Sequence, residues 1–272
     1  MTLEEKEKRL KEIIKGLESV VVAYSGGVDS TLVLRMCRDV LGEKVLAVTA
    51  RSETYPSVEL EEAKEMAHSL DVEHRVIETE ELAVPGFSHN PPDRCYWCKK
   101  ELFQKLRTLA REQGYKNVVD GANYEDGSDF RPGLRAGQEL GVVSPLKEAH
   151  FTKAEVRNLS RRLGLSTWDK PSYACLASRF PYGDEITREK LKRVARAEQF
   201  LREAGLRQFR VRAHGDVARI EVAKEHLGAL LESPLRERLI ASFKELGFIY
   251  IALDLEGYRS GSMNEPLRNA GD

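Results

Sequence analysis

Residues 20–41 read VVVAYSGGVDSTLVLRMCRDVL, and this stretch decides the fold. Its apolar, β-branched beginning, residues 20–24, predicts a buried strand, and the periodicity of residues 31–41 predicts a helix. Between them lies Ser25-Gly26-Gly27-Val28-Asp29-Ser30, here called the glycine turn. Two adjacent glycines let the backbone approach a ligand closely, and the N-terminus of the helix offers unpaired N–H groups to phosphate oxygens. The stretch therefore predicts a phosphate-binding turn between a strand and a helix.

The side chains of the glycine turn refine this prediction. The hydroxyls of Ser25 and Ser30 add hydrogen-bond donors for a phosphate. Asp29 would repel a bare anion, so its carboxylate indicates that a cation such as Mg²⁺ lies between it and the phosphate. The alternative is an ordinary strand-to-helix turn in which Asp29 or Ser30 caps the helix.

The alternation of strand and helix patterns continues through the first two thirds of the chain. Further strands are predicted at residues 45–49, 73–77, 117–120 and 142–143, and further helices at residues 58–70, 99–113 and 153–163. Strands that alternate with helices of crossover length predict an α/β fold with a doubly wound parallel sheet. Such sheets bind their ligands beyond the carboxyl ends of the strands.

The remaining sequence divides the chain into two domains. Residues 79–98, 121–132 and 168–183 carry Pro and Gly without periodicity, and we expect the first two of these loops to surround the site. After residue 186 a long charged helix, residues 188–204, precedes strands at residues 209–213, 217–222 and 248–253. We therefore expect an α/β domain of residues 1–185 and a smaller α+β domain of residues 186–272.

Composition restricts the class of protein. The formal net charge of −1 argues against a large nucleic-acid surface, which clusters many Lys and Arg. No apolar run has the length of a membrane span, and the charged, amphipathic start does not resemble a signal peptide. We expect a cytoplasmic protein without a membrane or nucleic-acid partner.

Four cysteines in a cytosolic chain of this size are not expected to form a disulfide framework; we expect them to be buried, metal-bound or catalytic. Cys37 stands on the apolar face of the first predicted helix and is expected in the core. Cys95 and Cys98 form a CxxC motif, and Cys175 lies in a later loop that we expect to approach them. Three thiolates suit a [4Fe–4S] cluster with one open iron, or a zinc site completed by a fourth ligand. A redox pair, or two partly buried cysteines, are the other readings of CxxC.

Cys175 also suits nucleophilic chemistry on its own. Its thiolate could attack an adenylated carboxylate and expel AMP, forming a thioester. The nearby cations Lys170 and Arg179 are expected to lower the pKa of this thiol.

The string SGGVDS resembles the pyrophosphate loop of the ATP pyrophosphatase superfamily, whose members split ATP between the α and β phosphates. No GK[ST] follows, so transfer of the γ-phosphate is disfavoured. The resemblance implies that ATP and Mg²⁺ bind here. It also implies that two strand ends lie near adenine or ribose, those with Thr49, Ala50 and Arg51 and with Gly121, Ala122 and Asn123.

Four motifs together, SGGVDS, RCYWCKKELF, GANYEDGSDFRPG and KPSYACLASRFPYG, resemble the LarE family. That family makes pyridinium-3,5-bisthiocarboxylic acid mononucleotide for the nickel-pincer cofactor, and the likeness spans nearly the whole chain. The resemblance implies that ATP adenylates a carboxylate of a pyridinium mononucleotide and that sulfur replaces the carboxylate oxygen. Cys175 falls at the family's sulfur-donating cysteine. The family has two forms. In one form this cysteine is sacrificed and loses its own sulfur, and in the other form three cysteines bind an iron–sulfur cluster. The presence of Cys95 and Cys98 beside Cys175 resembles the cluster form.

The same resemblance implies that Trp97, Arg212 and Arg259 line the site for substrate or phosphate. From the residues alone, each Arg also suits a solvated surface charge, and Trp97 suits packing. The family resemblance implies a homo-oligomer; the sulfide source is not indicated.

Three competing functions stay open. They are a tRNA thiolation enzyme of the same superfamily, an amidotransfer-type synthetase such as an NAD or GMP synthase, and a noncatalytic nucleotide sensor with a structural zinc site. Val28, where cluster-bearing tRNA enzymes usually have Lys, argues against the first.

Overall fold

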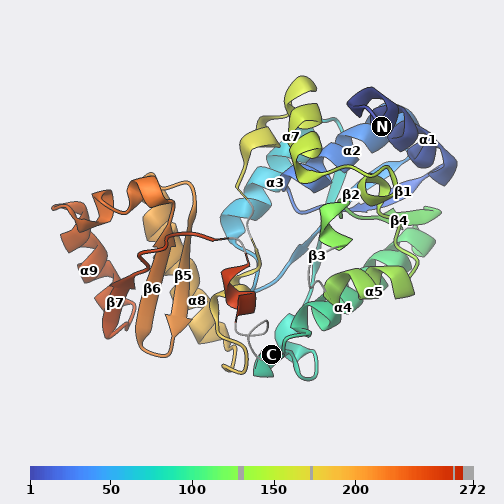
Figure 1. The fold of residues 1–272 in the computed structure, drawn as a ribbon. Coiled ribbons are helices and arrows are strands. Elements are labelled where there is room, and N and C mark those ends of the chain that lie inside the picture. Colours follow the sequence, from blue (N-terminus) through green and yellow to red (C-terminus); the bar gives the residue numbers. More distant parts are fainter. Residues whose placement is uncertain (128–131, 172–173, 260, 266–272) are drawn as a thin grey trace. The chain divides into compact units, whose positions relative to one another are not determined.

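The computed structural model describes residues 1–127, 132–171, 174–259 and 261–265. The chain divides into two compact units, shown in Figure 1. Unit 1 contains residues 1–87 and 92–173, and unit 2 contains residues 88–91 and 174–272. The division at residue 174 precedes the expected domain boundary at residue 185, which stays a prediction. Residues 128–131 of the predicted loop 121–132, and residues 172–173 of the predicted loop 168–183, lie outside the described residues.

Unit 1 is built on a four-stranded parallel sheet in the order β3-β2-β1-β4. The strands are β1 (Val20–Ala23), β2 (Val45–Arg51), β3 (Glu73–Glu78) and β4 (Asn117–Val119). Val20 pairs with Val45 on one side and with Asn117 on the other, so β1 is central. The predicted strand at residues 142–143 is reduced to a single parallel bridge between Val119 and Val143.

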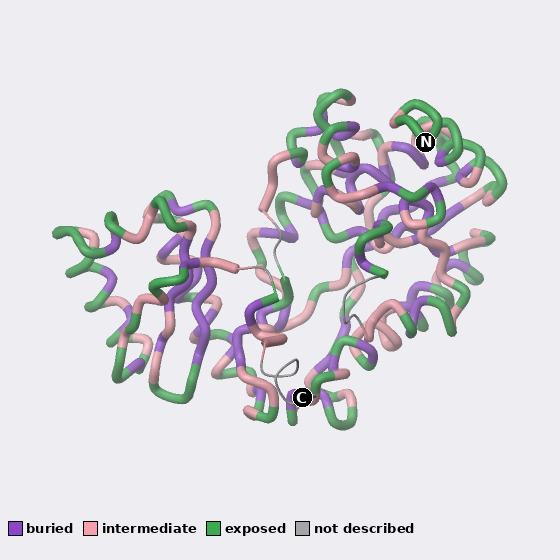
Figure 2. The backbone as a smooth tube through the Cα atoms, in the orientation of Figure 1, coloured by how far each residue is buried: buried purple, intermediate pink, exposed green. Residues whose placement is uncertain are grey.

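Helices cover both faces of this sheet because successive strand residues point to opposite sides. Val20 and Val22 pack with helices α1 (Leu3–Leu17), α2 (Val28–Leu41) and α7 (Lys153–Arg162). Val21 packs on the other face with α4 (Arg94–Glu112). Buried residues run along the central strands in Figure 2: β1 and β2 are mostly buried, whereas β3 has no buried residue. The doubly wound parallel sheet predicted from the sequence is therefore present.

Three further helices complete unit 1: α3 (Ser57–Ser69), α5 (Pro132–Glu139) and α6 (Pro145–Glu148). Helix α5 is not among the helices predicted from the sequence. Gly133 and Gly137 weaken its helical pattern, but a Cβ on either glycine would come within 3.4 Å of α4 side chains, so close packing on α4 explains the helix.

Helices α2 and α4 begin several residues earlier than predicted, and both shifts concern the site. Helix α2 begins at Val28 rather than at residue 31, with Gly27 as its N-cap. Helix α4 begins at Arg94 rather than at residue 99, so Cys95 and Cys98 lie in its first turns. The first turn of a helix carries little of the apolar period, which explains both errors.

Unit 2 contains a three-stranded mixed sheet with strand order β5-β6-β7. Strands β5 (Phe209–His214) and β6 (Val217–Val222) are antiparallel, and β7 (Tyr250–Leu253) is parallel to β6. Helices α8 (Arg188–Glu203) and α9 (Leu235–Glu245) complete its core, where the Phe243 ring lies 5.9 Å from that of Phe248. The predicted α+β character of this part is present.

Candidate active site

The glycine turn follows β1 directly and is closed by its own serines. Ser25 Oγ lies 3.1 Å from Ser30 Oγ, and the Ser30 hydroxyl donates to the carbonyl of Gly27 at 3.2 Å. Gly26 has φ +64°, and a Cβ placed on it would stand 3.0 Å from the Cβ of Ala63 on α3. Both the backbone conformation and the packing therefore require glycine at position 26.

Helix α2 presents free N–H groups at this turn. Thr31 N donates to Gly27 O, which closes the first turn, whereas no hydrogen bond from the N–H of Val28, Asp29 or Ser30 to a described residue is present. Unpaired N–H groups and the positive end of the helix dipole favour an anion. The predicted phosphate-binding geometry is thus available.

The end of β4 lies against the same turn. A Cβ on Gly121 would stand 2.8 Å from Ser30 N, so the two backbones are in direct contact. The chain runs outward from β1 to β2 and β3 on one side and to β4 on the other. The point where strand order reverses is where open α/β sheets bind ligands.

Asp29 is held by two residues that come from distant parts of unit 1. Asn123 Nδ2 donates to Asp29 Oδ1 at 3.2 Å, and Lys153 Nζ forms an ion pair with Asp29 Oδ2. Asn123 is itself buried and accepts the amides of Glu125 and Asp126 at its Oδ1. Asp29 is therefore an anchored carboxylate beside a cation, and not a helix cap.

Lys153 is not among the site residues predicted from the sequence. A signal was present: Thr152 and Glu155 form a capping box, which places Lys153 at the first residue of α7 with its amide donating to Glu125 at 2.9 Å. A capping box fixes where a helix starts but not what its first side chain contacts.

The three residues predicted at the end of β2 have different surroundings. Thr49 is buried and donates to Tyr24 O at 2.8 Å, which ties β2 to the start of the glycine turn. Because that proton is used, His74 Nε2, 2.8 Å from Thr49 Oγ1, must be the donor of the second bond. Ala50 is half-buried, and Arg51 is exposed and pairs with Glu78 of β3.

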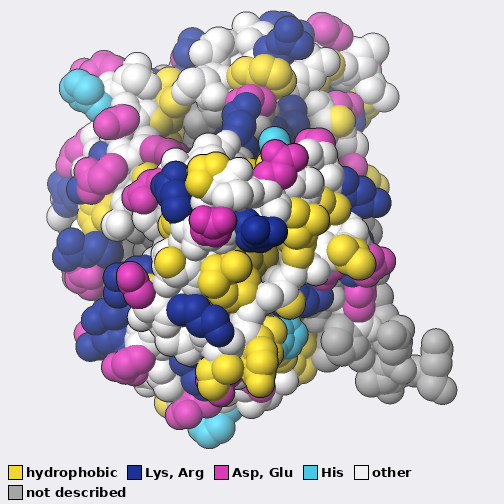
Figure 3. Space-filling view, turned by 90° about the vertical axis from the view of Figure 1, so that its left-hand side faces the viewer, with side chains coloured by type: hydrophobic (Ala, Val, Ile, Leu, Met, Phe, Trp, Pro, Cys, Tyr) yellow, Lys and Arg dark blue, Asp and Glu magenta, His cyan; other side chains and the backbone are white. Residues whose placement is uncertain are grey.

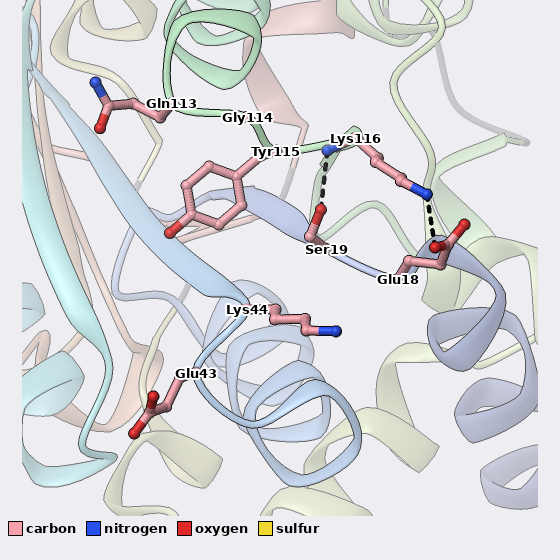
Figure 4. Close-up of a pocket in the computed structure, with 8 residues that line it drawn as sticks. All are labelled: Glu18, Ser19, Glu43, Lys44, Gln113, Gly114, Tyr115 and Lys116. Carbon is pink, nitrogen blue, oxygen red and sulfur yellow. Dashed lines mark hydrogen bonds and ion pairs between the residues drawn. The ribbon is translucent and has the colours of Figure 1, made fainter.

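A hollow of about 380 Å³ lies at the other end of the sheet. Its lining comes from the segments that precede β1, β2 and β4, including Ser19, Lys44 and Lys116 (Figure 4). Lys116 is tied to Ser19 through its amide and to Glu18 through its ammonium. The amino ends of the strands point here, so this hollow is separate from the glycine turn.

The CxxC cysteines lie three residues apart on α4 and share one face of it. Cys95 is exposed and Cys98 is half-buried, with its Sγ 3.9 Å from Oε1 of Glu81. Trp97, 38% exposed, donates to Asp93 Oδ2 at 3.2 Å and packs edge-on against Tyr96 at 5.0 Å between ring centroids. Cys37 is buried, as expected, and burial raises the pKa of its thiol to about 12.

Cys175 belongs to unit 2, where its side chain is exposed and its backbone is anchored. Arg179, fully buried, donates to the carbonyls of Ala174 at 2.9 Å and Cys175 at 3.3 Å. The same guanidinium makes two hydrogen bonds to Glu198, at 2.7 and 2.9 Å. Arg179 therefore holds the backbone of Cys175, while Glu198 balances its charge.

The second cation expected to act on Cys175 is also paired. Lys170, in unit 1, binds Glu59 at 2.8 Å and Glu62 at 2.6 Å. The expectation that Lys170 and Arg179 lower the pKa of the Cys175 thiol stays a prediction, now with both cations neutralised by carboxylates.

The two predicted anion-binding arginines differ in burial. Arg212 is buried within β5, with Nε and Nη2 on Glu221 at 3.0 and 2.8 Å and Nη1 on Ser178 O at 2.9 Å. It lies within its strand and is not a solvated surface charge. Arg259 is one third exposed and pairs with Glu256 and Glu265.

Comparison with known proteins identifies the family. The pyridinium-3,5-bisthiocarboxylic acid mononucleotide synthase of Lactiplantibacillus plantarum is 40% identical over 270 residues, which cover 99% of this chain and 97% of the relative. The chain belongs to this family, the LarE family. A family model described as NAD synthase matches residues 3–108, the part that contains the glycine turn.

Two other relatives also match most of the chain. An uncharacterized protein of Synechocystis is 46% identical over 265 residues, 97% of this chain and 99% of the relative. An uncharacterized protein of Methanocaldococcus jannaschii is 32% identical over 251 residues, 92% and 94%. Membership of the LarE family confirms the resemblance predicted from the sequence motifs. The parallel sheet with its pyrophosphate loop confirms the predicted fold class.

Three further observations on this LarE family member concern its surface charge, its helices and its metal-ligating side chains. On the face shown in Figure 3, Lys and Arg side chains lie among Asp and Glu side chains and form no continuous basic patch. None of the helices in the described parts of the chain is long and apolar enough to cross a bilayer. Within the same residues, no three His, Cys, Asp or Glu side chains are grouped to hold a metal ion.

Proposed function

We propose that this chain is an ATP-dependent sulfur transferase of nickel-pincer cofactor biosynthesis. ATP adenylates one carboxylate of a pyridinium dicarboxylic acid mononucleotide and releases pyrophosphate. Sulfide then replaces AMP on the acyl carbon, which leaves a thiocarboxylate. Membership of the LarE family supports this assignment, because the Lactiplantibacillus plantarum relative carries the name of that reaction's product.

The arrangement around Asp29 carries the proposal. Free N–H groups at the start of α2, with the hydroxyls of Ser25 and Ser30 and the backbones of Gly26 and Gly27, suit a pyrophosphate group. The ammonium of Lys153, beside Asp29, adds positive charge where phosphate charge develops. A carboxylate at this place also fits Mg²⁺, which would neutralise phosphate charge when bound to Asp29.

The nucleoside part of ATP belongs at the neighbouring strand ends. We assign adenine and ribose to Thr49, Ala50 and Arg51 after β2 and to Gly121 and Asn123 after β4. Support comes from the contact of Gly121 with the glycine turn and from the hydrogen bond of Thr49 to Tyr24 O. Crevices at a switch in strand order take nucleotides in this way.

Cys175 is the proposed catalytic residue of sulfur transfer, and together with Cys95 and Cys98 it would hold a [4Fe–4S] cluster. Thiolates are the ligands that such clusters require, and the CxxC spacing puts two of them on one face of α4. If bound by these three cysteines, such a cluster would have one iron without a protein ligand, and this iron would supply a binding place for an additional sulfide. In the sacrificial alternative, Cys175 gives up its own sulfur.

Trp97, Arg212 and Arg259 are proposed to line the site of the pyridinium mononucleotide and its phosphate. Arg259 is partly exposed and suits direct contact, whereas Arg212 would act through its network with Glu221 and Ser178. We further propose that the protein is a cytoplasmic homo-oligomer that acts on a small-molecule substrate and binds no nucleic acid.

The test separates adenylation from sulfur transfer. Anaerobically prepared protein receives ATP, Mg²⁺, the pyridinium dicarboxylic acid mononucleotide and sulfide, and AMP and thiocarboxylate are measured. Cys175→Ala is expected to abolish thiocarboxylate while substrate-dependent exchange of pyrophosphate into ATP continues. Equal loss of both activities contradicts a sulfur-handling role for Cys175.

The mass of the polypeptide distinguishes the two sulfur sources. After a single turnover, the cluster form keeps its mass, and the sacrificial form loses the elements of hydrogen sulfide. Brown protein with bound iron and sulfide is expected for the wild type, and neither Cys95→Ala nor Cys98→Ala should retain the cluster. Activity on tRNA, with none on the mononucleotide, would refute the proposal.

A further inference from the structure

Two side chains from outside the glycine turn hold successive carbonyl groups within it. The Tyr55 hydroxyl donates to Ser25 O at 2.9 Å, and Lys170 Nζ donates to Gly26 O at 3.3 Å. Tyr55 lies between β2 and α3, and Lys170 follows the short 3-10 helix Ser166–Asp169. The proposed function gives neither side chain a task at the nucleotide.

These two bonds determine where the next amides point. In a trans peptide the C=O of one residue and the N–H of the next are directed to opposite sides. Hence the N–H groups of Gly26 and Gly27 point away from Tyr55 and Lys170. Neither N–H donates to any residue that the structure describes. They are available to an anion at the start of α2.

Without such bonds this part of the backbone would be the least constrained in the turn. Glycine populates positive and negative φ about equally, and Gly26 is followed by a second glycine. A flip of the peptide between Gly26 and Gly27 would turn a carbonyl oxygen toward the phosphate in place of an N–H donor. The side chains that hold the two carbonyls therefore decide which face of the turn the ligand meets.

Lys170 is itself firmly held. Its side chain is 13% exposed, and its three donors are taken up by Glu59, Glu62 and Gly26 O. Burial disfavours its charge, but the two carboxylates outweigh burial and raise its pKa. Burial, with the charge of Glu59, also raises the pKa of the Tyr55 phenol, so the phenol keeps its proton and donates.

We propose that Tyr55 and Lys170 are positioning residues for ATP, which fix the Ser25–Gly26 and Gly26–Gly27 peptides with their N–H groups toward the pyrophosphate. This inference rests on the proposed ATP site and adds the residues that preorganise it. Preorganisation lowers the ordering cost that a ligand meets on binding. Loss of either side chain should therefore weaken binding of the phosphates and should not change the sulfur-transfer step directly.

The test measures binding of ATP·Mg²⁺ and of inorganic pyrophosphate to the full chain by calorimetry. Tyr55→Phe removes one hydroxyl, and we expect Kd for both ligands to rise about tenfold, the loss of one hydrogen bond. Lys170→Met is expected to raise Kd by at least as much, and Lys170→Arg to restore part of the affinity. The controls are Tyr115→Phe and Lys64→Met; Lys64 pairs with Glu61 of α3 without contacting the turn.

The outcomes separate this inference from the proposed function. Unchanged Kd in Tyr55→Phe and Lys170→Met, with tight binding by the wild type, overturns the positioning role alone. An equal rise of Kd in the two control variants overturns it as well, because the effect would then be general. No binding of ATP by the folded wild type would remove the proposed function itself.

Discussion

Gly121 approaches Ser30 so closely that a Cβ on Gly121 would stand 2.8 Å from the Ser30 backbone nitrogen. This contact joins the end of β4 to the first turn of α2. It leaves no room for any side chain at position 121, so the placement of the free amides depends on a glycine in the segment that follows β4.

Gly121→Ala is therefore expected to displace the start of α2. We expect kcat/KM for AMP formation to fall at least about tenfold, since the amides at the phosphate move by several tenths of an ångström. Steady-state AMP release measures this. Gly16→Ala is the control, because a Cβ at Gly16 meets no atom within 4 Å; similar losses in the two variants would refute the steric argument.

Asp29→Asn keeps the shape of the side chain and removes its charge. We expect AMP formation to fall about 100-fold, because the variant lacks the carboxylate that pairs with Lys153 and that we propose to position a metal ion. Asp39→Asn is the matched control, since Asp39 lies on the same helix and pairs with Arg35 at the surface. Unimpaired AMP formation by Asp29→Asn would rule out the assigned role.

Lys153→Met tests the partner of Asp29. If the two residues act as a unit, the double variant Asp29→Asn with Lys153→Met should be little worse than either single variant. A coupling energy of about 1 kcal/mol or more in a double-mutant cycle of kcat/KM is expected for residues in contact. Additive losses would mean that Lys153 and Asp29 contribute independently.

The thiols should differ in reactivity in the cluster-free protein. At pH 8 we expect iodoacetamide to modify the exposed Cys95 and Cys175 rapidly and Cys37 only after unfolding. The buried Cys37 thiol has a pKa of about 12, so its reactive thiolate is scarce at that pH. Peptide mass spectrometry with and without guanidinium chloride provides the measurement; early labelling of Cys37 would contradict the described core.

Acid should weaken unit 2 through Glu198. Burial alone would raise the pKa of this carboxyl, but the charge and hydrogen bonds of Arg179 outweigh burial and lower it. A lowered pKa in the folded state gives stability that is present above the unfolded value near 4.5 and is lost as pH falls through the folded pKa. Glu198→Gln should reduce the free energy of unfolding at pH 7 by about 3 kcal/mol and flatten its decline in acid.

Denaturant unfolding between pH 7 and pH 3 measures this effect. Glu203→Gln, an exposed position on the same helix, is the control. If Glu198→Gln and wild type lose stability in parallel as the pH falls, Glu198 is not the group that titrates.

The burial of Arg212 is a feature that the local sequence pattern does not predict. Arg212 and Glu221 lie on adjacent antiparallel strands, and their bidentate pair is made by the register of β5 with β6. Local sequence indicates only that Arg212 alternates with apolar residues. Whether such a residue meets solvent or a buried carboxylate depends on its neighbour in the sheet.

By itself the sequence determined the local units: the strand, glycine turn and helix of residues 20–41, the α/β class, and the family to which the chain belongs. The local units and the α/β class follow from backbone preferences and hydrophobic period, which act over a few residues, and the family follows from four sequence motifs. Only the tertiary structure decided that Lys153 reaches Asp29 across 124 residues of sequence and that Tyr55 and Lys170 hold the carbonyls of the turn. Such contacts depend on strand order and helix packing, for which no short stretch of sequence carries the information.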